Sequence, residues 1–193
     1  VKKNKVLSYS NLGQVYFKKK DYTKAIEYFK RLIKLNPSYV KARIYIIKSY
    51  IYLNNFEKAL ETANTVLQKN GINREVLGLK GFILMKNKEF QKAHSVIKRY
   101  YSYKPDNVKS LISMGCVLSE LGKFDSSERY LKRATTFYPR NLTARFLVLQ
   151  NNLLAKRYDE AEISARELFR MFPLVDIGKY FNKIDENGML SLP

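Results

Sequence analysis

Several residue types are scarce in this sequence, and each scarcity excludes a kind of structure or chemistry. Cys116 is the only cysteine, so no disulfide bond can form within the chain. His94 is the only histidine, which excludes a metal site built on a pair of histidines. No apolar run approaches the roughly 18–20 residues that a membrane-spanning helix needs. Only 5 prolines and 8 glycines occur in 193 residues, so little of the chain can be flexible linker.

Acidic residues are also few relative to basic ones. The chain has 36 Lys and Arg against 17 Asp and Glu, a formal net charge of +19. Such an excess favours an acidic partner, which would be an acidic protein, an anionic lipid surface or a nucleic acid. Lys, Asn, Ile and Tyr are all abundant, however, and the drift of an AT-rich genome would produce the same excess. Composition alone leaves both interpretations open.

The start of the chain gives no cellular address. It begins Val1-Lys2-Lys3 without an initiator methionine, so we expect that residues have been removed upstream. A removed signal peptide or lipid anchor would leave no trace in the remaining sequence. The composition predicts a soluble protein, and the sequence does not choose between the cytoplasm and the periplasm.

The strongest pattern is an internal repeat with a period of 34 residues. Large aromatic residues recur at this spacing, at Tyr22, Phe56, Phe90, Phe124 and Tyr158. Small residues follow three positions later, at Ala25, Ala59, Ala93, Ser127 and Ala161. Helix-breaking residues follow twelve positions after those, at Pro37, Gly71, Pro105, Pro139 and Pro173.

Each repeat carries two apolar stretches at helical spacing. The breaking residue, usually proline, ends the second stretch because proline cannot donate the next backbone hydrogen bond. The small residue lets two helices approach closely, and a large side chain there would cost roughly 1–3 kcal/mol. The pattern therefore predicts ten helices, at 6–19, 22–35, 40–54, 56–69, 74–87, 90–103, 108–121, 124–137, 142–156 and 158–172.

These positions resemble the tetratricopeptide repeat, whose pattern places Leu-Gly, Tyr, Ala, Phe and Pro at fixed spacing. The first repeat matches most fully, with Tyr9, Leu12-Gly13, Tyr16, Ala25, Phe29, Leu32 and Pro37. Later repeats depart from the pattern: Ile47 and Leu149 replace small residues, Lys80 stands at the Leu position and Asn152 at the Tyr position. The constant period supports the assignment over residues 6–173.

The resemblance implies an all-α fold, a right-handed solenoid of five helix-turn-helix repeats that forms a single domain over residues 1–193. The repeats are expected at 6–39, 40–73, 74–107, 108–141 and 142–175. A capping helix is expected from 174 to about 184, because Ile177, Tyr180, Phe181 and Ile184 share one helical face. A tail to residue 193 would follow it.

By resemblance to the family, the first helices line a concave groove that holds a partner. The family's groove positions fall here on Lys41, Ile44, Lys48, Tyr52, Phe82, Met85, Lys86, Ile112, Cys116, Phe146 and Gln150. An apolar, aromatic surface with a few lysines suits a protein segment that has hydrophobic anchors and acidic flanks. The alternative is that many of these residues simply pack against a neighbouring helix.

A second regularity lies on the expected second helices. Basic residues recur at multiples of 34, at Lys30, Arg31, Lys98, Arg99, Lys132, Arg133 and Arg166. We call this set the basic column, and we expect it on the outer surface. It would suit a polyanion or acidic lipid headgroups. The alternative is a solvated face that only keeps the protein in solution.

No catalytic motif is present, so we expect neither an enzyme nor a cofactor, a metal or a small-molecule substrate. Gly78 and Gly81 lack the spacing of a phosphate-binding loop and fall in a predicted helix. The leading hypothesis is a protein-binding scaffold that works through the groove, and the runner-up is an adaptor to an anionic surface through the basic column. A third possibility is a segment of a larger protein, in which Val6, Leu7 and Tyr9 would be covered by upstream structure.

Overall fold

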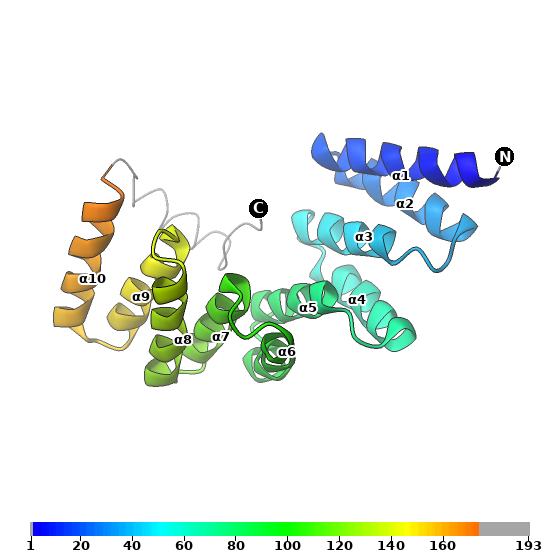
Figure 1. The fold of residues 1–193 in the computed structure, drawn as a ribbon. Coiled ribbons are helices and arrows are strands. Elements are labelled where there is room, and N and C mark those ends of the chain that lie inside the picture. The colour runs from blue at the N-terminus through cyan, green and yellow to red at the C-terminus, as the bar shows by residue number, and fades with distance from the viewer. Residues whose placement is uncertain (1, 174–193) are drawn as a thin grey trace. The chain divides into compact units, whose positions relative to one another are not determined.

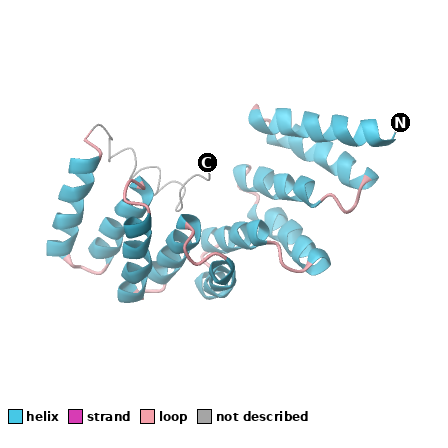
Figure 2. Cartoon of the chain, in the orientation of Figure 1, coloured by secondary structure: helices cyan, strands magenta, loops and turns pink. Residues whose placement is uncertain are grey.

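The fold is built from helices alone in the part of the chain that the structure describes. It is a computed structural model that describes residues 2–173, and Figure 2 shows helices joined by short loops throughout this range. The all-α fold predicted from the 34-residue period is therefore confirmed over these residues. The capping helix predicted after residue 174 lies outside the described residues.

The helices fall into two compact units, residues 1–87 and 88–193, here called the N-terminal and C-terminal units. The N-terminal unit contains α1 (Lys2–Lys18), α2 (Tyr22–Leu35), α3 (Val40–Tyr52), α4 (Phe56–Asn70) and α5 (Arg74–Lys86). The C-terminal unit contains α6 (Phe90–Tyr103), α7 (Val108–Glu120), α8 (Phe124–Phe137), α9 (Leu142–Leu154) and α10 (Tyr158–Met171). Figure 1 labels each helix. The single domain expected over 1–193 stays a prediction.

Helix starts follow the repeat closely, because the residue before a helix often caps it. From α2 to α10, every helix starts at the predicted residue. The side chains of Asp21, Asn55, Asn73 and Asn141 each accept a hydrogen bond from the backbone N–H three residues later. This bond satisfies one of the free N–H groups at a helix start and stabilises the helix by about 1 kcal/mol.

The turn inside each repeat requires a left-handed backbone at one position. This position is Lys20, Asn54, Lys88, Gly122 and Lys156 in the five repeats, with φ values of 62°, 54°, 59°, 70° and 59°. Only glycine adopts this conformation without a steric penalty, and asparagine tolerates it. Three of the five turns therefore hold a lysine in a conformation that lysine disfavours.

The close contact between the two helices of a repeat depends on complementary side-chain size. A Cβ atom on Gly13 would lie 2.7 Å from the ring of Phe29, and one on Gly115 would lie 2.5 Å from Leu131. In the fifth repeat the sizes are exchanged: Leu149 stands at the glycine position and packs with Ala165. The departure at Leu149 is therefore compensated on the facing helix.

The second repeat has the same exchange. Ile47 stands at the glycine position, and Ala63 stands where the first repeat has Phe29; both side chains are fully buried. A departure from the family pattern that looks unfavourable in a single helix is thus consistent with a well-packed helix pair.

First helices and second helices stack differently. In the N-terminal unit α1 contacts α3, and α3 contacts α5; in the C-terminal unit α7 contacts α9. The backbones of the second helices within a unit lie further apart, and α6 and α8 meet through long side chains such as Tyr101 and Tyr130. The first helices therefore lie closer together and form one face of each unit, while the second helices stand apart on the other.

Candidate functional site

Aromatic side chains gather where α1, α2 and α3 of the N-terminal unit meet. The ring of Phe17 lies 5.2 Å from that of Tyr45 and 5.8 Å from that of Tyr52, centroid to centroid, both edge-on. Tyr22 and Tyr52 stack face to face at 4.7 Å, nearly parallel. Such pairs add roughly 0.5–1.5 kcal/mol beyond the burial of area. Tyr52 nevertheless keeps 41% of its surface exposed, so the cluster presents a preformed apolar surface to solvent.

Lysines also lie on α3 and α5 of the same unit. Lys41 is exposed on α3. The Nζ atom of Lys48 lies 6.0 Å from the ring of Tyr45 and 2.6 Å from the Glu75 carboxylate of α5. Lys86 lies 5.6 Å from the ring of Phe82, and burial lowers the pKa of its ammonium group. The combination of exposed rings and ammonium groups would attract a segment with apolar side chains and carboxylates.

The predicted groove residues divide by burial. Ile44, Met85 and Phe146 are buried and present little surface to a partner. Lys41 and Tyr52 are exposed, and the remaining six are half-buried: Lys48, Phe82, Lys86, Ile112, Cys116 and Gln150. The exposed and half-buried members in the N-terminal unit form what we call the first-helix face: Lys41, Lys48, Tyr52, Phe82 and Lys86.

All seven residues of the basic column are exposed, but many of their charges are compensated. The guanidinium group of Arg133 donates to Asp106, at 2.5 Å, and to the hydroxyl of Tyr101, at 2.9 Å. Carboxylates also pair with three others; the pairs are Arg31 with Glu27, Lys132 with Glu128, and Arg166 with Glu162. This internal pairing leaves less free positive charge on the column than its sequence suggests.

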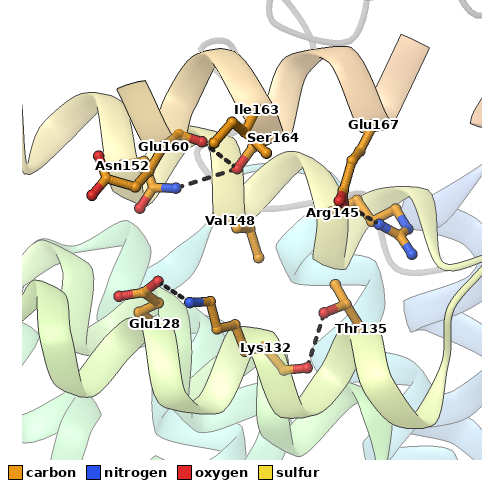
Figure 3. Close-up of a pocket in the computed structure, with 10 residues that line it drawn as sticks. All are labelled: Glu128, Lys132, Thr135, Arg145, Val148, Asn152, Glu160, Ile163, Ser164 and Glu167. Atoms are coloured by element: carbon orange, nitrogen blue, oxygen red, sulfur yellow. Dashed lines mark hydrogen bonds and ion pairs between the residues drawn. The ribbon is translucent and has the colours of Figure 1, made fainter. Parts of the chain in front are cut away.

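A groove of about 350 Å³ lies on the second-helix side of the C-terminal unit. Because α8 and α10 stand apart, they form its two walls, and α9 lies between them (Figure 3). Val148 and Ile163 supply apolar surface near the middle of the groove. Its other lining residues are polar or charged: Glu128, Lys132, Thr135, Arg145, Asn152, Glu160, Ser164 and Glu167.

The polar groups of this groove mostly bind one another. Arg145 pairs with Glu167 at 3.2 Å, and Lys132 pairs with Glu128 at 2.6 Å (Figure 3). Because these charges are already neutralised, the groove is a weaker candidate for partner binding than the first-helix face.

The buried amide of Asn152 is only partly satisfied. The Ser164 hydroxyl donates its hydrogen to the Glu160 carbonyl, so it can only accept from the Asn152 amide. The Oδ1 atom of Asn152 is left buried without a hydrogen-bond partner. A buried acceptor of this kind costs about 1–3 kcal/mol, so Asn152 weakens the unit rather than building a binding site.

Two potentially reactive side chains, Cys116 and His94, have shifted pKa values. Burial, helped by Glu120, raises the pKa of the Cys116 thiol to about 12, so the thiol stays protonated and is a poor nucleophile. Burial lowers the pKa of His94, and the nearby Lys123 and Lys98 lower it further. Over residues 2–173, the structure contains no cluster of side chains suited to a metal ion. None of the helices described could cross a membrane, since none is both long and apolar enough.

Two features of these surfaces were not predicted from the sequence. The first is the stacking of Tyr22 on Tyr52. Tyr22 was predicted only as part of the repeat pattern and Tyr52 only as a groove residue, although the 34-residue period indicates that their helices are neighbours. The groove along α9 was also missed. In the sequence, this groove is indicated by two acidic residues of the fifth repeat, Glu160 and Glu167. The first repeat has the basic residues Lys24 and Arg31 at the same positions.

Two family models match the chain. The model described as "Tetratricopeptide repeat" matches residues 6–39, and "Psidin, N-terminal TPR repeats region" matches residues 41–177. "Anaphase-promoting complex subunit CDC16" of Saccharomyces cerevisiae is 31% identical over 111 residues, 54% of this chain and 13% of that protein. "BBSome complex member BBS4" of Bos taurus is 27% identical over 120 residues, 62% of this chain and 23% of that protein. The chain thus spans less than a quarter of the length of either relative.

Solved structures share the fold. MamA from Desulfovibrio magneticus RS-1 has a TM-score of 0.76 at 16% identity, over 88% of this chain and 94% of that one. A tetratricopeptide repeat protein from Parabacteroides merdae has a TM-score of 0.80 at 16% identity, over 94% and 72%. YrrB, described as a TPR protein with an unusual peptide-binding site, has a TM-score of 0.72 at 14% identity, over 91% and 90%. At these identities the likeness concerns the fold alone.

Proposed function

This chain belongs to the tetratricopeptide-repeat family, and on that premise we propose that it is a scaffold that binds a segment of another protein. The observation that carries this proposal is the first-helix face, where exposed aromatic surface lies among lysines. The segment would place apolar side chains on Tyr52 and Phe82 and carboxylates near Lys41 and Lys86.

Relatives support a scaffolding role by what their names state. CDC16 is a subunit of the anaphase-promoting complex, and BBS4 is a member of the BBSome complex, so both are components of larger assemblies. YrrB is described as having a peptide-binding site on the same fold. A binding role needs no catalytic group, which agrees with the protonated thiol of Cys116. The absence of enzymatic activity stays a prediction.

The proposal can be tested with a displayed library of random 12-residue peptides, selected on the intact chain. We expect the enriched peptides to combine aromatic or aliphatic residues with Asp or Glu. Their affinity should fall at least about tenfold in a Tyr52→Ala, Phe82→Ala double variant, because loss of two aromatic anchors removes several kcal/mol of contact. Unchanged affinity in a variant whose circular dichroism is intact would refute the role of this face.

Tyr158→Ala is the matched control, since Tyr158 is an exposed tyrosine on α10, a second helix of the other unit. It should leave affinity unchanged.

The runner-up hypothesis, an adaptor to RNA or anionic lipid through the basic column, makes a different prediction. Replacing Lys98 and Arg99 with Glu should then abolish binding to RNA or anionic vesicles at low salt. The first-helix-face proposal expects little effect of these two substitutions on peptide affinity.

A further inference from the structure

Two turns of the C-terminal unit are bound to each other along one edge. Residues 104–107 form the turn after α6, and residues 138–141 form the turn after α8. The hydroxyl of Tyr138 donates a hydrogen bond to the backbone carbonyl of Asp106, at 2.9 Å. The Arg133 guanidinium donates to the carboxylate of the same residue, at 2.5 Å. The ends of α6 and α8 therefore form one continuous edge, although the two backbones lie apart.

The positive charge of the C-terminal unit is concentrated at this edge. Residues 98–109 and 132–145 contain both helix ends and both turns, and together they have 8 Lys and Arg and one acidic residue, Asp106. The rest of the unit has 10 Lys and Arg against 11 Asp and Glu. The net charge of +6 on the unit thus consists of +7 at the edge and −1 elsewhere.

Most cations of this edge have no carboxylate partner. Three of the eight are paired within the unit, namely Lys132, Arg133 and Arg145. In the described part of the chain, the other five make no ion pair and are all exposed: Lys98, Arg99, Lys104, Lys109 and Arg140. Free cations that gather on one edge attract a ligand with several negative charges.

Aromatic rings are exposed among these cations. Tyr103 is 36% exposed, Phe137 is 52% exposed and Tyr138 is 37% exposed. The Arg133 guanidinium lies 5.7 Å from the centre of the Phe137 ring, and the hydrogen bond to the neighbouring turn holds Tyr138. These two rings are therefore positioned before a ligand binds, which reduces the cost of ordering them. We call the following set the loop edge: Arg99, Tyr103, Lys104, Phe137, Tyr138 and Arg140.

Rings that alternate with free cations suit a ligand that repeats an anion and an aromatic face. Each nucleotide of a single strand offers a phosphate and a base that can stack on a ring. A duplex has phosphates at higher density, but its bases are already stacked on one another. A lipid surface has anions without rings. An acidic protein segment has rings only where its own sequence places them.

We propose that the loop edge binds single-stranded nucleic acid, RNA or DNA, with its phosphates at the cations and its bases stacked on the exposed rings. This site goes beyond the scaffold role and lies in the unit that does not contain the first-helix face. It also differs from the hypothesis for the basic column, because the rings make binding selective for unpaired bases.

The test compares three fluorescent probes by anisotropy on the intact chain, at about 50 mM salt as a low ionic strength. Two are single strands of uridine and of thymidine, each about 12 nucleotides, within the roughly 4–16 nucleotides that one binding fold covers. The third is a GC-rich duplex of the same length. The single strands should bind at least about tenfold more tightly than the duplex. Charge alone predicts the reverse order, because the duplex has twice as many phosphates.

The two single strands identify the source of the ligand, because only RNA has a 2′-hydroxyl. Tight binding of either strand supports the proposal, and the tighter of the two indicates whether RNA or DNA is the natural ligand.

Ring variants test the stacking. Phe137→Ala with Tyr103→Ala should weaken single-strand binding at least about tenfold and change duplex binding little, because each ring stacks on a base. Circular dichroism checks that the fold is intact. Tyr158→Ala is the matched control, an exposed tyrosine on α10 that should have no effect. Tyr52→Ala with Phe82→Ala should also have no effect, which separates this site from the first-helix face.

Charge variants count the phosphate contacts. Lys104→Ala with Arg140→Ala should lower the slope of log affinity against log salt by about 1.4, because each contact with a single strand contributes roughly 0.7. Lys92→Ala with Lys123→Ala makes the same change in net charge near the starts of α6 and α8, at their opposite ends. This control should leave the slope almost unchanged.

Three outcomes would overturn the proposal. The first is absent binding of both single strands, or binding of the duplex that is equal or tighter. The second is single-strand binding that survives the Phe137→Ala, Tyr103→Ala change in a folded variant. The third is displacement of the bound strand by an equal concentration of a peptide of about 12 alternating Glu and Tyr residues, because it assigns the loop edge to an acidic protein.

Discussion

The N-terminal and C-terminal units contain the same helix types but differ sharply in charge. Each has 18 Lys and Arg, yet the N-terminal unit has 5 Asp and Glu and the C-terminal unit has 12. Their net charges are therefore +13 and +6. Several described carboxylates of the C-terminal unit pair with its basic residues, as Asp106 and Glu128 show with Arg133 and Lys132.

This difference shows that the basic excess of the chain is not a uniform background. A genome-wide drift towards lysine would act on both units alike, but it would not explain why acidic residues are kept in one and rare in the other. The larger net positive charge lies in the unit that also has the exposed aromatic cluster. The search for an acidic partner should therefore begin at the N-terminal unit.

The largest effect is expected at the close contact between the two helices of a repeat, which occurs at Gly13 in one unit and at Gly115 in the other. Gly13→Ala and Gly115→Ala should each destabilise the chain by about 1–3 kcal/mol, because the new Cβ overlaps Phe29 or Leu131. The loss should be larger at Gly13, since an aromatic ring adapts less easily than a leucine. Urea unfolding followed by circular dichroism measures both losses.

A paired exchange is the control for that prediction. Gly115→Leu combined with Leu131→Ala reproduces the arrangement of Leu149 and Ala165, so it should recover part of the stability that Gly115→Leu alone removes. Equal losses in the single and double variants would contradict size complementarity.

The next largest effect is a gain in stability, and it is expected in the C-terminal unit alone. Asn152→Leu should raise the free energy of unfolding by about 1 kcal/mol, since it removes a buried acceptor that has no partner. Leu84 and Leu118 are buried at the same position in other repeats. Thermal unfolding measures the gain, and a lower midpoint would show that the Asn152–Ser164 bond matters more.

A smaller gain is expected at the turns of both units. Lys20→Gly in the N-terminal unit and Lys156→Gly in the C-terminal unit should each stabilise the chain by roughly 0.5–1 kcal/mol, because glycine adopts positive φ freely. Lys19→Gly is the control, since Lys19 does not have a positive φ and should gain nothing. Equal effects at Lys19 and Lys20 would mean that charge removal, not backbone conformation, causes the change.

The smallest effect concerns salt. Raising the ionic strength shortens the range of charge repulsion, so it should slow amide hydrogen exchange more in α1–α3 than in α8–α10. The reason is the excess of 13 positive charges in the N-terminal unit against 6 in the other. Hydrogen exchange with mass spectrometry on the intact chain resolves the two regions. An equal response would show that the difference in net charge does not affect the local stability of the two units.

The 34-residue period predicted the helices well because it reports which residues face a neighbouring helix. Proline and small residues at fixed positions limit each helix, so the starts from Tyr22 to Tyr158 were predicted correctly. Single-helix reasoning was less successful at Ile47 and Leu149, which looked like weak points of the pattern. Their compensation by Ala63 and Ala165 is visible only when facing helices are compared.

The candidate sites were less predictable than the helices. Family positions identify residues on the first helices, but they do not tell how deeply each side chain is buried. Phe146 was expected in the groove and is a core residue that packs with Leu149 and Leu168. The pairing of Arg133 with Asp106 was also invisible, because the two residues are 27 positions apart and meet only through helix packing.

The exchange of large and small residues between facing helices has a consequence for engineering. A consensus repeat averages each position separately, so it could combine the isoleucine of position 47 with the phenylalanine of position 29 in one unit. That combination would overfill the space that either residue fills alone. A repeat with glycine at the position of Gly13 and alanine at the position of Ala63 would instead leave a void between its two helices. Helices of this chain should therefore be transplanted as matched pairs, and not mixed freely between repeats.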